Sequence, residues 1–335
     1  MKALVFDRHG DPARVLRQVD VPRPEPGPGQ VRVRVTARPV NPSDLLFIQG
    51  CYGRRARFET RSDGPGGTGA VAAAGFEGAG VVDAVGPETS GPASGTRVAV
   101  AADGTWQEYV CAPAQDVIPV GAHLPLDAAC QLTVNPFTAH LLLAGLGLRA
   151  DDSVLLTAGA SAVGRMIAWL AQRQGIRCLS CVRREEQLRP LERAGAVPLL
   201  VRTGTELAER AREATGGRSV NAALDSVGGA LGGAALRWVR PGGRFVSYGM
   251  LSGRPLPVPP ESLIFQQVRV TGFWLPERLE RLEPTAVRRV TEEVGRAVTA
   301  GLPGLEVAAR YSLDEYTAAL GHASRPGRTG KVLLT

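Results

Sequence analysis

The chain has 335 residues, of which 44% are hydrophobic and 21% charged, and its mean hydropathy is −0.02. This composition excludes a disordered or fibrous chain, and at about 150 residues per domain the length predicts two domains. Lysine and arginine number 39 against 32 aspartate and glutamate, a net charge of +7, but the arginines are scattered and no basic run indicates a nucleic-acid-binding arm.

The first third of the chain has the pattern of short strands separated by glycine and proline. Its N-terminus reaches an acid at Asp7, too early for a signal-peptide core, and no apolar stretch approaches the ~20 residues that span a bilayer. We therefore expect a cytoplasmic protein. Valines alternate with polar residues over 31–36, the period of a half-buried strand. Further strands are expected at 80–85, 97–101 and 108–112.

Residues 54–74 are rich in Gly, Arg and Ala and show no clear period. Such a composition offers little apolar surface to bury, so we predict a surface loop there. The short strands around this loop indicate an all-β, barrel-like first domain.

From about residue 124 to residue 273 the pattern changes to alternating strands and helices. Strands are predicted at 153–157, 176–182, 197–201, 220–225, 244–248 and 268–271. A helical stretch over 163–174, which Gly175 ends, separates the first two strands. Repeated β-α-β units imply a parallel sheet with helices on both faces, and right-handed crossovers make a doubly wound fold the default.

The C-terminal part of the chain is mixed. Apolar residues at helical spacing predict one helix over 284–301; they are Val287, Val290, Val294 and Val298. A final strand over 331–334 is expected to rejoin the first domain. The expected organisation is thus a discontinuous domain, 1–122 and 274–335, into which a nucleotide-binding domain, 123–273, is inserted.

A loop of small residues follows the first strand of the alternating region. Residues 158–164 read Ala-Gly-Ala-Ser-Ala-Val-Gly and lead into a helix, whose first backbone amides can bind a pyrophosphate. Gly159 permits the turn, Ala162 stands where a second glycine is usual, and Gly164 allows the helix to pack closely on the strand. The expected cofactor contacts are Thr157, Gly159, Ala160, Ser161, Ala162, Val163 and Gly164, with Thr157 and Ser161 as donors to phosphate.

The residues after the second strand indicate which nicotinamide cofactor binds. An NAD enzyme has an acid about 20 residues after the loop for the ribose 2′-hydroxyl, whereas this chain has Arg183 and Arg184 there and no acid before Glu185. Arginine binds phosphate bidentately, so the pair suits the 2′-phosphate of NADPH; a solvated pair at a strand end is the alternative. The carboxyl edge of the sheet should also carry Tyr248, Gly249 and Met250.

Several motifs resemble those of the medium-chain dehydrogenase/reductase superfamily. Residues 75–86, GFEGAGVVDAVG, are similar to its signature segment, in which zinc-dependent members have His where this chain has Phe76. Those members also have a Cys ligand near 41–44, which here reads Asn-Pro-Ser-Asp, and no four closely spaced Cys are present for a structural zinc. The resemblance implies metal-free catalysis in a β-barrel-like (GroES-like) catalytic domain with an inserted Rossmann domain.

Within the superfamily, the chain most resembles the 2-enoyl thioester reductases, the mitochondrial-type enoyl-acyl-carrier-protein and enoyl-CoA reductases. The motifs that carry this resemblance are 41–44 (NPSD), 48–53 (IQGCYG), 104–106 (GTW), 134–139 (VNPFTA), 182–184 (VRR), 262–265 (SLIF) and 272–275 (GFWL). Quinone oxidoreductases share 225–229 (DSVGG) but not the GFW motif. The resemblance implies NADPH-dependent reduction of a 2-enoyl C=C bond, with hydride to the β-carbon and a proton to the α-carbon, by a homodimer.

Three other functions stay open at this point. The chain could reduce quinones or enones, or act in trans as an enoyl reductase of a biosynthetic pathway. From a different class, it could bind NADPH without turnover. The loop after Tyr52 is longer and richer in Gly and Arg than is usual for the family, which is compatible with docking an acidic carrier protein.

The resemblance places Tyr52 at the family's catalytic tyrosine, where a phenol can donate a hydrogen bond or a proton; a tyrosine that packs a turn is the alternative. Asn41 and Asn135, each followed by Pro, are expected as amides that face the nicotinamide ribose or the substrate, with a simple turn role as the alternative. Aromatic residues that could line an apolar acyl channel, or else belong to the core, are Trp106, Phe265, Phe273 and Trp274. Further expected cofactor contacts are Thr138, Phe273, Trp274 and Lys331.

Overall fold

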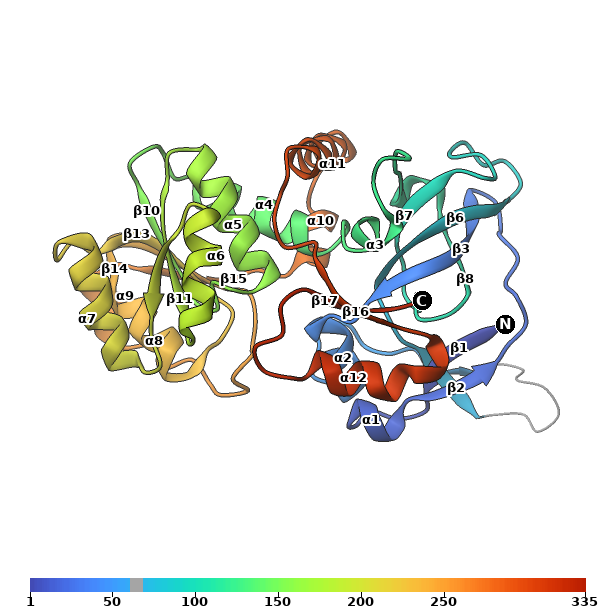
Figure 1. Ribbon diagram of the computed structural model, residues 1–335, viewed down its shortest axis with the longest axis horizontal. Helices are drawn as coiled ribbons and strands as arrows, with labels where there is room; N and C mark the ends of the chain where they lie inside the picture. The colour runs from blue at the N-terminus through green and yellow to red at the C-terminus, as the bar shows by residue number, and fades with distance from the viewer. Residues whose placement is uncertain (61–68) are drawn as a thin grey trace. The chain divides into compact units, whose positions relative to one another are not determined.

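The computed structural model describes residues 1–60 and 69–335. These divide into two compact units: unit 1 comprises Met1–Val134 and Leu305–Thr335, and unit 2 comprises Asn135–Gly304 (Figure 1). Unit 1 is discontinuous in sequence, as expected.

The boundaries between the units lie further along the chain than the expected 122/123 and 273/274. The reason is helix packing. Helix α3 (Leu126–Ala129) packs on strands of unit 1, so the first crossing comes after it. Helix α11 (Pro284–Thr299) packs on α4 (Asn135–Leu146), where the Nε2 of His140 lies 2.9 Å from a carboxylate oxygen of Glu293, so α11 belongs to unit 2.

Unit 1 is built from two sheets. One has the order β16-β17-β3-β6-β7-β9, with β8 also paired to β3, and the other has the order β2-β1-β5-β4. The strands are β1 (Lys2–Phe6), β2 (Arg17–Asp20), β3 (Gln30–Pro39), β4 (Glu59–Thr60), β5 (Ala70–Ala73), β6 (Glu77–Val85), β7 (Arg97–Ala101), β8 (Tyr109–Pro113), β9 (Val117–Pro119), β16 (Val307–Tyr311) and β17 (Lys331–Leu334). The helices, besides α3, are α1 (Pro12–Val15), α2 (Pro42–Gln49) and α12 (Tyr316–Ala323).

The local patterns of unit 1 are confirmed where they are periodic. On β3 the alternating residues Val31, Val33 and Val35 are buried and Arg34 is exposed, as expected, but Arg32 is also buried, because it pairs with Asp83 on the neighbouring strand. The C-terminal strand β17 pairs antiparallel with β3, which confirms that the chain returns to the first unit.

The surface loop expected over 54–74 is wrong at its C-terminal end. Strand β5 pairs antiparallel with β1, and its residues Val71 and Ala72 are buried. β4 pairs with β5 in turn. Alanines carry no recognisable period, so it is the pairing with a distant strand that makes this segment part of a sheet. Residues 61–68 of the expected loop lie outside the described residues.

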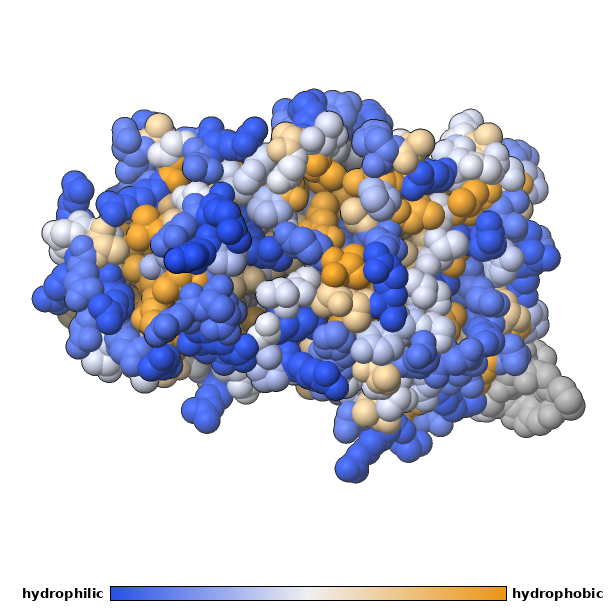
Figure 2. Space-filling view, viewed as in Figure 1, coloured by the Kyte–Doolittle hydropathy of each residue, from blue (hydrophilic) through white to orange (hydrophobic). Residues whose placement is uncertain are grey.

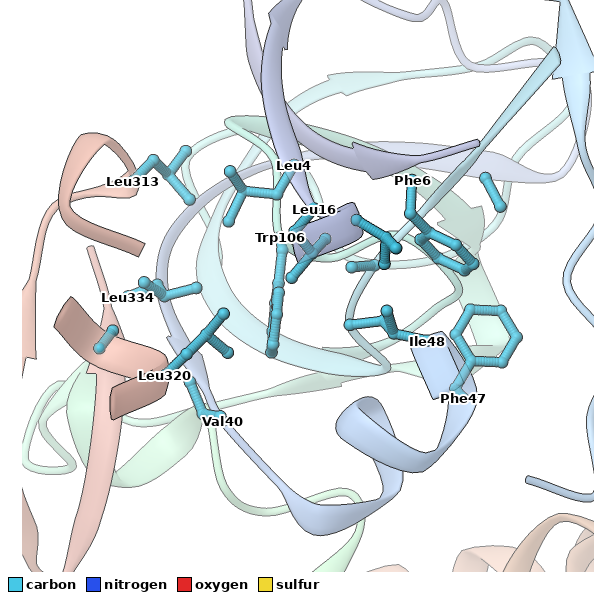
Figure 3. Close-up of a cluster of buried hydrophobic side chains, with 14 of the residues drawn as sticks. Leu4, Phe6, Leu16, Val40, Phe47, Ile48, Trp106, Leu313, Leu320 and Leu334 are labelled. Carbon is cyan, nitrogen blue, oxygen red and sulfur yellow. The ribbon is translucent and has the colours of Figure 1, made fainter. Parts of the chain in front are cut away.

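Trp106 belongs to the core of unit 1, which corrects the expectation that it lines an acyl channel. Figure 3 shows its side chain among Leu4, Leu16 and Val40. It is fully buried, and its indole Nε1 donates to the carbonyl of Pro39 at 3.2 Å. A large aromatic residue is more often a core residue than a ligand contact, and the hydrogen bond satisfies its one polar atom.

Unit 2 contains a parallel sheet with the order β12-β11-β10-β13-β14-β15. Its strands are β10 (Ser153–Leu156), β11 (Arg177–Val182), β12 (Val197–Leu200), β13 (Val220–Asp225), β14 (Val239–Ser247) and β15 (Arg269–Gly272). Its helices, besides α4 and α11, are α5 (Ala162–Arg173), α6 (Leu188–Arg193), α7 (Gly204–Thr215), α8 (Gly229–Arg237), α9 (Pro260–Ile264) and α10 (Leu275–Glu280). This order confirms the doubly wound fold.

Helices cover both faces of this sheet. α7 and α8 pack on the face that carries Leu155 and Phe245, and α5 lies on the opposite side (Figure 1). The strand order reverses between β10 and β13, and in such sheets ligands bind at the carboxyl ends of the strands beside that reversal. The fold therefore places the loop after β10 at the position expected for a nucleotide.

Hydrophilic side chains dominate the face of the molecule shown in Figure 2, with apolar residues in smaller areas between them. Within residues 1–60 and 69–335, no helix combines the length and the apolar character needed to cross a membrane.

Candidate active site

Tyr52 lies just beyond the end of α2. The helix ends at Gly50, whose φ of 76° is in the left-handed region and where a Cβ would lie 2.8 Å from the ring of His9. Only glycine allows this turn, which brings the half-buried Tyr52 ring to 5.4 Å from the ring of Phe76, measured between centroids. The expected proton donor thus sits beside the residue that occupies the zinc-ligand position of zinc-dependent superfamily members.

Aromatic and cationic groups surround Phe76. Its ring centroid is 4.9 Å from that of Phe47, and the guanidinium of Arg54, which forms an ion pair with Asp103, lies 5.5 Å from its centroid. The described part of the chain has no group of three or more His, Cys, Asp and Glu side chains that could hold a metal ion. The residues at this position do not fit a catalytic zinc, which needs nitrogen, sulfur or carboxylate ligands.

Asn41 lies in a buried polar cluster, which corrects the expectation that it faces a ligand. Its Nδ2 donates to Glu77 Oε1 at 2.8 Å, and its Oδ1 accepts from Lys331 Nζ at 2.6 Å. Both ends of the amide are occupied and the residue is 2% exposed. Lys331, 6% exposed, belongs to the same cluster, and its contact with the cofactor stays a prediction.

Glu77 is the centre of this cluster. Its Oε2 accepts hydrogen bonds from Thr133 N at 3.1 Å, Thr133 Oγ1 at 2.9 Å and Val134 N at 3.0 Å. Burial raises the pKa of Glu77 and lowers the pKa of Lys331. Asp44, which caps α2 by accepting from Asn41 N at 2.8 Å, has its pKa raised to about 8, chiefly by burial.

Glu77 is a residue whose role the sequence alone does not predict. The sequence feature that could have pointed to Glu77 is its position, directly after Phe76 and before the apolar run of the signature segment 75–86.

The small-residue loop of unit 2 is tightly packed, as expected. A Cβ at Gly159 would lie 2.5 Å from Ser180 Cβ, and a Cβ at Gly164 would lie 2.5 Å from the Gly159 carbonyl oxygen. Ser161 caps α5, with its Oγ accepting from Gly164 N at 3.1 Å, and Ala160, Ala162 and Val163 are half-buried. The loop before α5 therefore has only small side chains close to the first helix amides, as a phosphate site requires.

Thr157 does not have the role expected for it. Its Oγ1 donates to Asp225 Oδ1 at 2.6 Å and accepts from Ser226 N at 3.0 Å, and the residue is fully buried. A hydroxyl has one proton, and that proton is committed to the carboxylate. The expectation that Thr157 donates to phosphate is therefore wrong.

Arg183 and Arg184 follow the carboxyl end of β11, which is the neighbour of β10 in the sheet. Arg183 is exposed; Arg184 is half-buried, with Nη1 3.7 Å from a carboxylate oxygen of Glu186. The pair thus lies at the same sheet edge as the small-residue loop, where the ribose end of a dinucleotide is expected.

Other expected cofactor residues lie at several places in unit 2. Asn135 opens α4 and is 8% exposed, and its Nδ2 has no hydrogen-bond partner within the described residues, which fits a ligand-facing amide. Thr138 is half-buried on the same helix. Burial raises the pKa of Tyr248 to about 12, so its hydroxyl stays protonated. Gly249 packs closely, since a Cβ there would lie 2.8 Å from the Ser226 carbonyl oxygen, and Met250 is 53% exposed.

Phe273 and Trp274 line an open cavity of about 220 Å³ in unit 2. Leu141, Leu142 and Val246 form other walls, and Arg278 and Arg281 also line it. Phe265, in contrast, is 81% exposed and is not among the residues that line this cavity. That Phe273 and Trp274 face a substrate stays a prediction.

Two family models match the sequence: "Alcohol dehydrogenase GroES-like domain" over residues 27–122 and "Zinc-binding dehydrogenase" over residues 162–292. The mitochondrial enoyl-[acyl-carrier-protein] reductase of Bos taurus is 29% identical over 342 aligned positions, which cover 100% of this chain and 88% of the relative. The protein of the same name from Arabidopsis thaliana is 32% identical over 283 positions, covering 82% of this chain and 72% of the relative.

Solved structures are similar over the whole chain. An NADPH:quinone reductase structure from Bacillus thuringiensis has a TM-score of 0.88 at 30% identity and covers 100% of this chain and 98% of its own. A mycobacterial protein complexed with NADPH has a TM-score of 0.87 at 29% identity, with coverages of 100% and 99%. With its GroES-like unit, its doubly wound unit and these relatives, the chain belongs to the medium-chain dehydrogenase/reductase superfamily of oxidoreductases.

Proposed function

We propose that the protein uses NADPH to reduce the C=C bond of 2-enoyl thioesters without a metal ion. The observation that carries the proposal is the half-buried Tyr52 beside Phe76, in a chain that matches enoyl reductases along its full length. Bound NADPH supplies the hydride that the β-carbon receives.

Tyr52 supplies the acid in this reaction. Hydride addition places negative charge on the thioester carbonyl oxygen and leaves the α-carbon in need of a proton. A phenol can donate a hydrogen bond to that oxygen or a proton to the carbon. The rings of Phe76 and Phe47 form an apolar wall next to it, which strengthens such a hydrogen bond by excluding water.

Unit 2 has the groups that NADPH requires. The amides at the start of α5 and the hydroxyl of Ser161 suit the pyrophosphate, and Arg183 with Arg184 suits the 2′-phosphate. The buried amide of Asn135 suits the nicotinamide ribose or the substrate.

Replacing Arg183 and Arg184 together by serine is expected to weaken NADPH binding by roughly 10- to 100-fold, the loss that corresponds to one charge-assisted hydrogen bond to the 2′-phosphate at about 1.5–3 kcal/mol. NADH binding should stay within about twofold, since NADH has no 2′-phosphate. Titration of both cofactors by nicotinamide fluorescence measures this. Arg189→Ser, an exposed arginine on α6, is the matched control. An unchanged NADPH:NADH ratio in the double variant would contradict the assignment.

The second candidate function is reduction of quinones or free enones. The structural similarity to an NADPH:quinone reductase favours it, whereas the GFWL motif at 272–275 favours the enoyl reductase. Action in trans on a carrier-bound substrate remains a third proposal; part of the loop expected to dock a carrier, 61–68, lies outside the described residues.

NADPH consumption with crotonyl-CoA, a medium-chain enoyl-CoA and a simple quinone, measured side by side, tests the proposal. We expect the thioesters to be turned over much faster than the quinone. Turnover of the quinone alone would assign the second candidate function and remove the role of Tyr52. Tight NADPH binding with no turnover of any of the three would indicate binding without catalysis on these substrate classes.

A homodimer is part of the proposal. Strand β15 ends the described sheet order and pairs with β14 alone, so one of its edges offers free backbone groups. Large apolar side chains are also exposed in unit 2, with Ile264 at 59% and Phe265 at 81%. Exposed apolar residues and a free strand edge are each typical of surfaces that a second copy covers.

A further inference from the structure

We infer that Asp225 is a positioning residue of the nucleotide site, which acts through Thr157 and through the turn at 226–228. The inference rests on the proposed binding of NADPH. It concerns residues that touch no ligand themselves but determine where the two loops at the sheet edge lie.

Asp225 stands at the reversal of strand order. It is the last residue of β13, and Thr157 directly follows β10, the neighbouring strand on the other side of the reversal. Both side chains are fully buried. A hydrogen bond of 2.6 Å between them therefore ties together the two strand ends between which dinucleotides bind.

The carboxylate of Asp225 accepts hydrogen bonds only from neutral donors. Besides Thr157 Oγ1, these are Val227 N, at 3.0 Å from Oδ1, and Gly228 N, at 3.0 Å from Oδ2 and 3.2 Å from Oδ1. No basic side chain pairs with it within residues 1–60 and 69–335. A fully buried carboxylate is costly unless such bonds satisfy it, so the 226–228 turn is held where its amides point at Asp225.

Thr157 completes the arrangement because its hydroxyl is oriented by Asp225. With its proton directed to the carboxylate, the oxygen presents a lone pair to Ser226 N at 3.0 Å. Thr157 also begins the turn into the small-residue loop at 158–164. The loop after β10 and the turn after β13 are thus linked through one hydroxyl.

The turn at 226–228 supports residues 248–252, the segment that carries the expected cofactor residues Tyr248, Gly249 and Met250. The Asp225, Ser226 and Val227 carbonyls accept from Tyr248 N, Leu251 N and Ser252 N at 2.8, 3.0 and 3.0 Å. Gly249 packs directly on Ser226. Displacing the turn would therefore move 248–252 as well.

The experiment compares wild type with Asp225→Asn, Thr157→Val and Thr157→Ser. In Thr157→Val the shape is kept but Asp225 Oδ1 and Ser226 N lose a partner, and we expect NADPH and NADH to bind roughly tenfold more weakly with their ratio unchanged. Asp225→Asn should do the same, because its single amide oxygen can replace only one of the two carboxylate oxygens: with that oxygen at the Oδ1 position, the amide nitrogen at the Oδ2 position cannot accept from Gly228 N. Thr157→Ser keeps the hydroxyl and should bind both cofactors within about twofold of wild type.

Leu224→Ala, a fully buried core change one residue away on β13, is the control for general destabilisation and should lower Tm without changing either Kd. Hydrogen exchange without nucleotide supplies a second readout: the amides of 226–228 and 248–252 should exchange faster in Asp225→Asn and Thr157→Val, but not in Thr157→Ser.

Folded Asp225→Asn and Thr157→Val variants that bind NADPH as wild type does would overturn the inference and leave the proposed function standing. A wild-type protein that fails to bind NADPH would overturn both.

Discussion

Tyr52→Phe is expected to lower kcat on 2-enoyl thioesters by a factor of about 10² or more, because general acid catalysis contributes about 10²- to 10⁴-fold and the variant removes only the phenolic hydroxyl. The ring contact with Phe76 is kept, and a Tm measurement shows whether the variant is folded. The NADPH dissociation constant should also stay within about twofold, since the cofactor residues proposed above lie in unit 2. Steady-state kinetics with crotonyl-CoA, together with an NADPH titration, measures these effects.

Tyr109→Phe is the matched control for this variant. Tyr109 is a half-buried tyrosine of unit 1 whose ring lies 5.0 Å from the Arg23 guanidinium, and it has no part in the proposed chemistry. Its kcat should equal that of wild type. Equal turnover by Tyr52→Phe and Tyr109→Phe would show that Tyr52 only packs the turn after α2.

Glu77→Ala is expected to lower the free energy of unfolding of unit 1 by about 3–5 kcal/mol, the usual cost of removing one partner from a buried charge cluster. The variant leaves Asn41 Nδ2, the Thr133 donors and Val134 N without an acceptor and removes the negative charge that compensates Lys331. Urea unfolding followed by near-UV circular dichroism measures the effect.

A double-mutant cycle measures the interaction energy between the charges of Glu77 and Lys331 in this cluster. Lys331→Met should lower the free energy of unfolding less in a Glu77→Gln background than in wild type, by at least about 1 kcal/mol. In that background the buried anion is already absent, so removing the Lys331 cation loses no attraction to it. Additive costs would show that the two residues do not interact. The exposed ion pair of Lys2 with Asp314, 2.6 Å long, is the contrast: Asp314→Asn should change stability little, since water screens that pair.

Wherever a segment has a local period, the sequence alone was sufficient. β13 spans the predicted 220–225, α11 begins at the predicted Pro284, and the six strands of unit 2 lie within a few residues of their expected positions. Burial in a parallel sheet requires apolar runs, and helix packing requires apolar residues every three or four positions, so both leave a trace in the sequence. The small-residue loop was equally readable, because close packing around Gly159 and Gly164 permits no larger side chain.

Only the tertiary structure decided which polar residues are free to act. Asn41 and Lys331 are 290 residues apart in the chain, and the sequence around each of them does not indicate that their side chains are hydrogen-bonded to each other. The sequence likewise predicts Thr157 as a phosphate donor, whereas in the fold its hydroxyl donates to Asp225. A buried polar group must find a partner, but the partner comes from whichever strand the topology brings alongside. Long-range pairing has no local pattern, and for the same physical reason β5, the Trp106 core and the role of Glu77 emerged only from the fold.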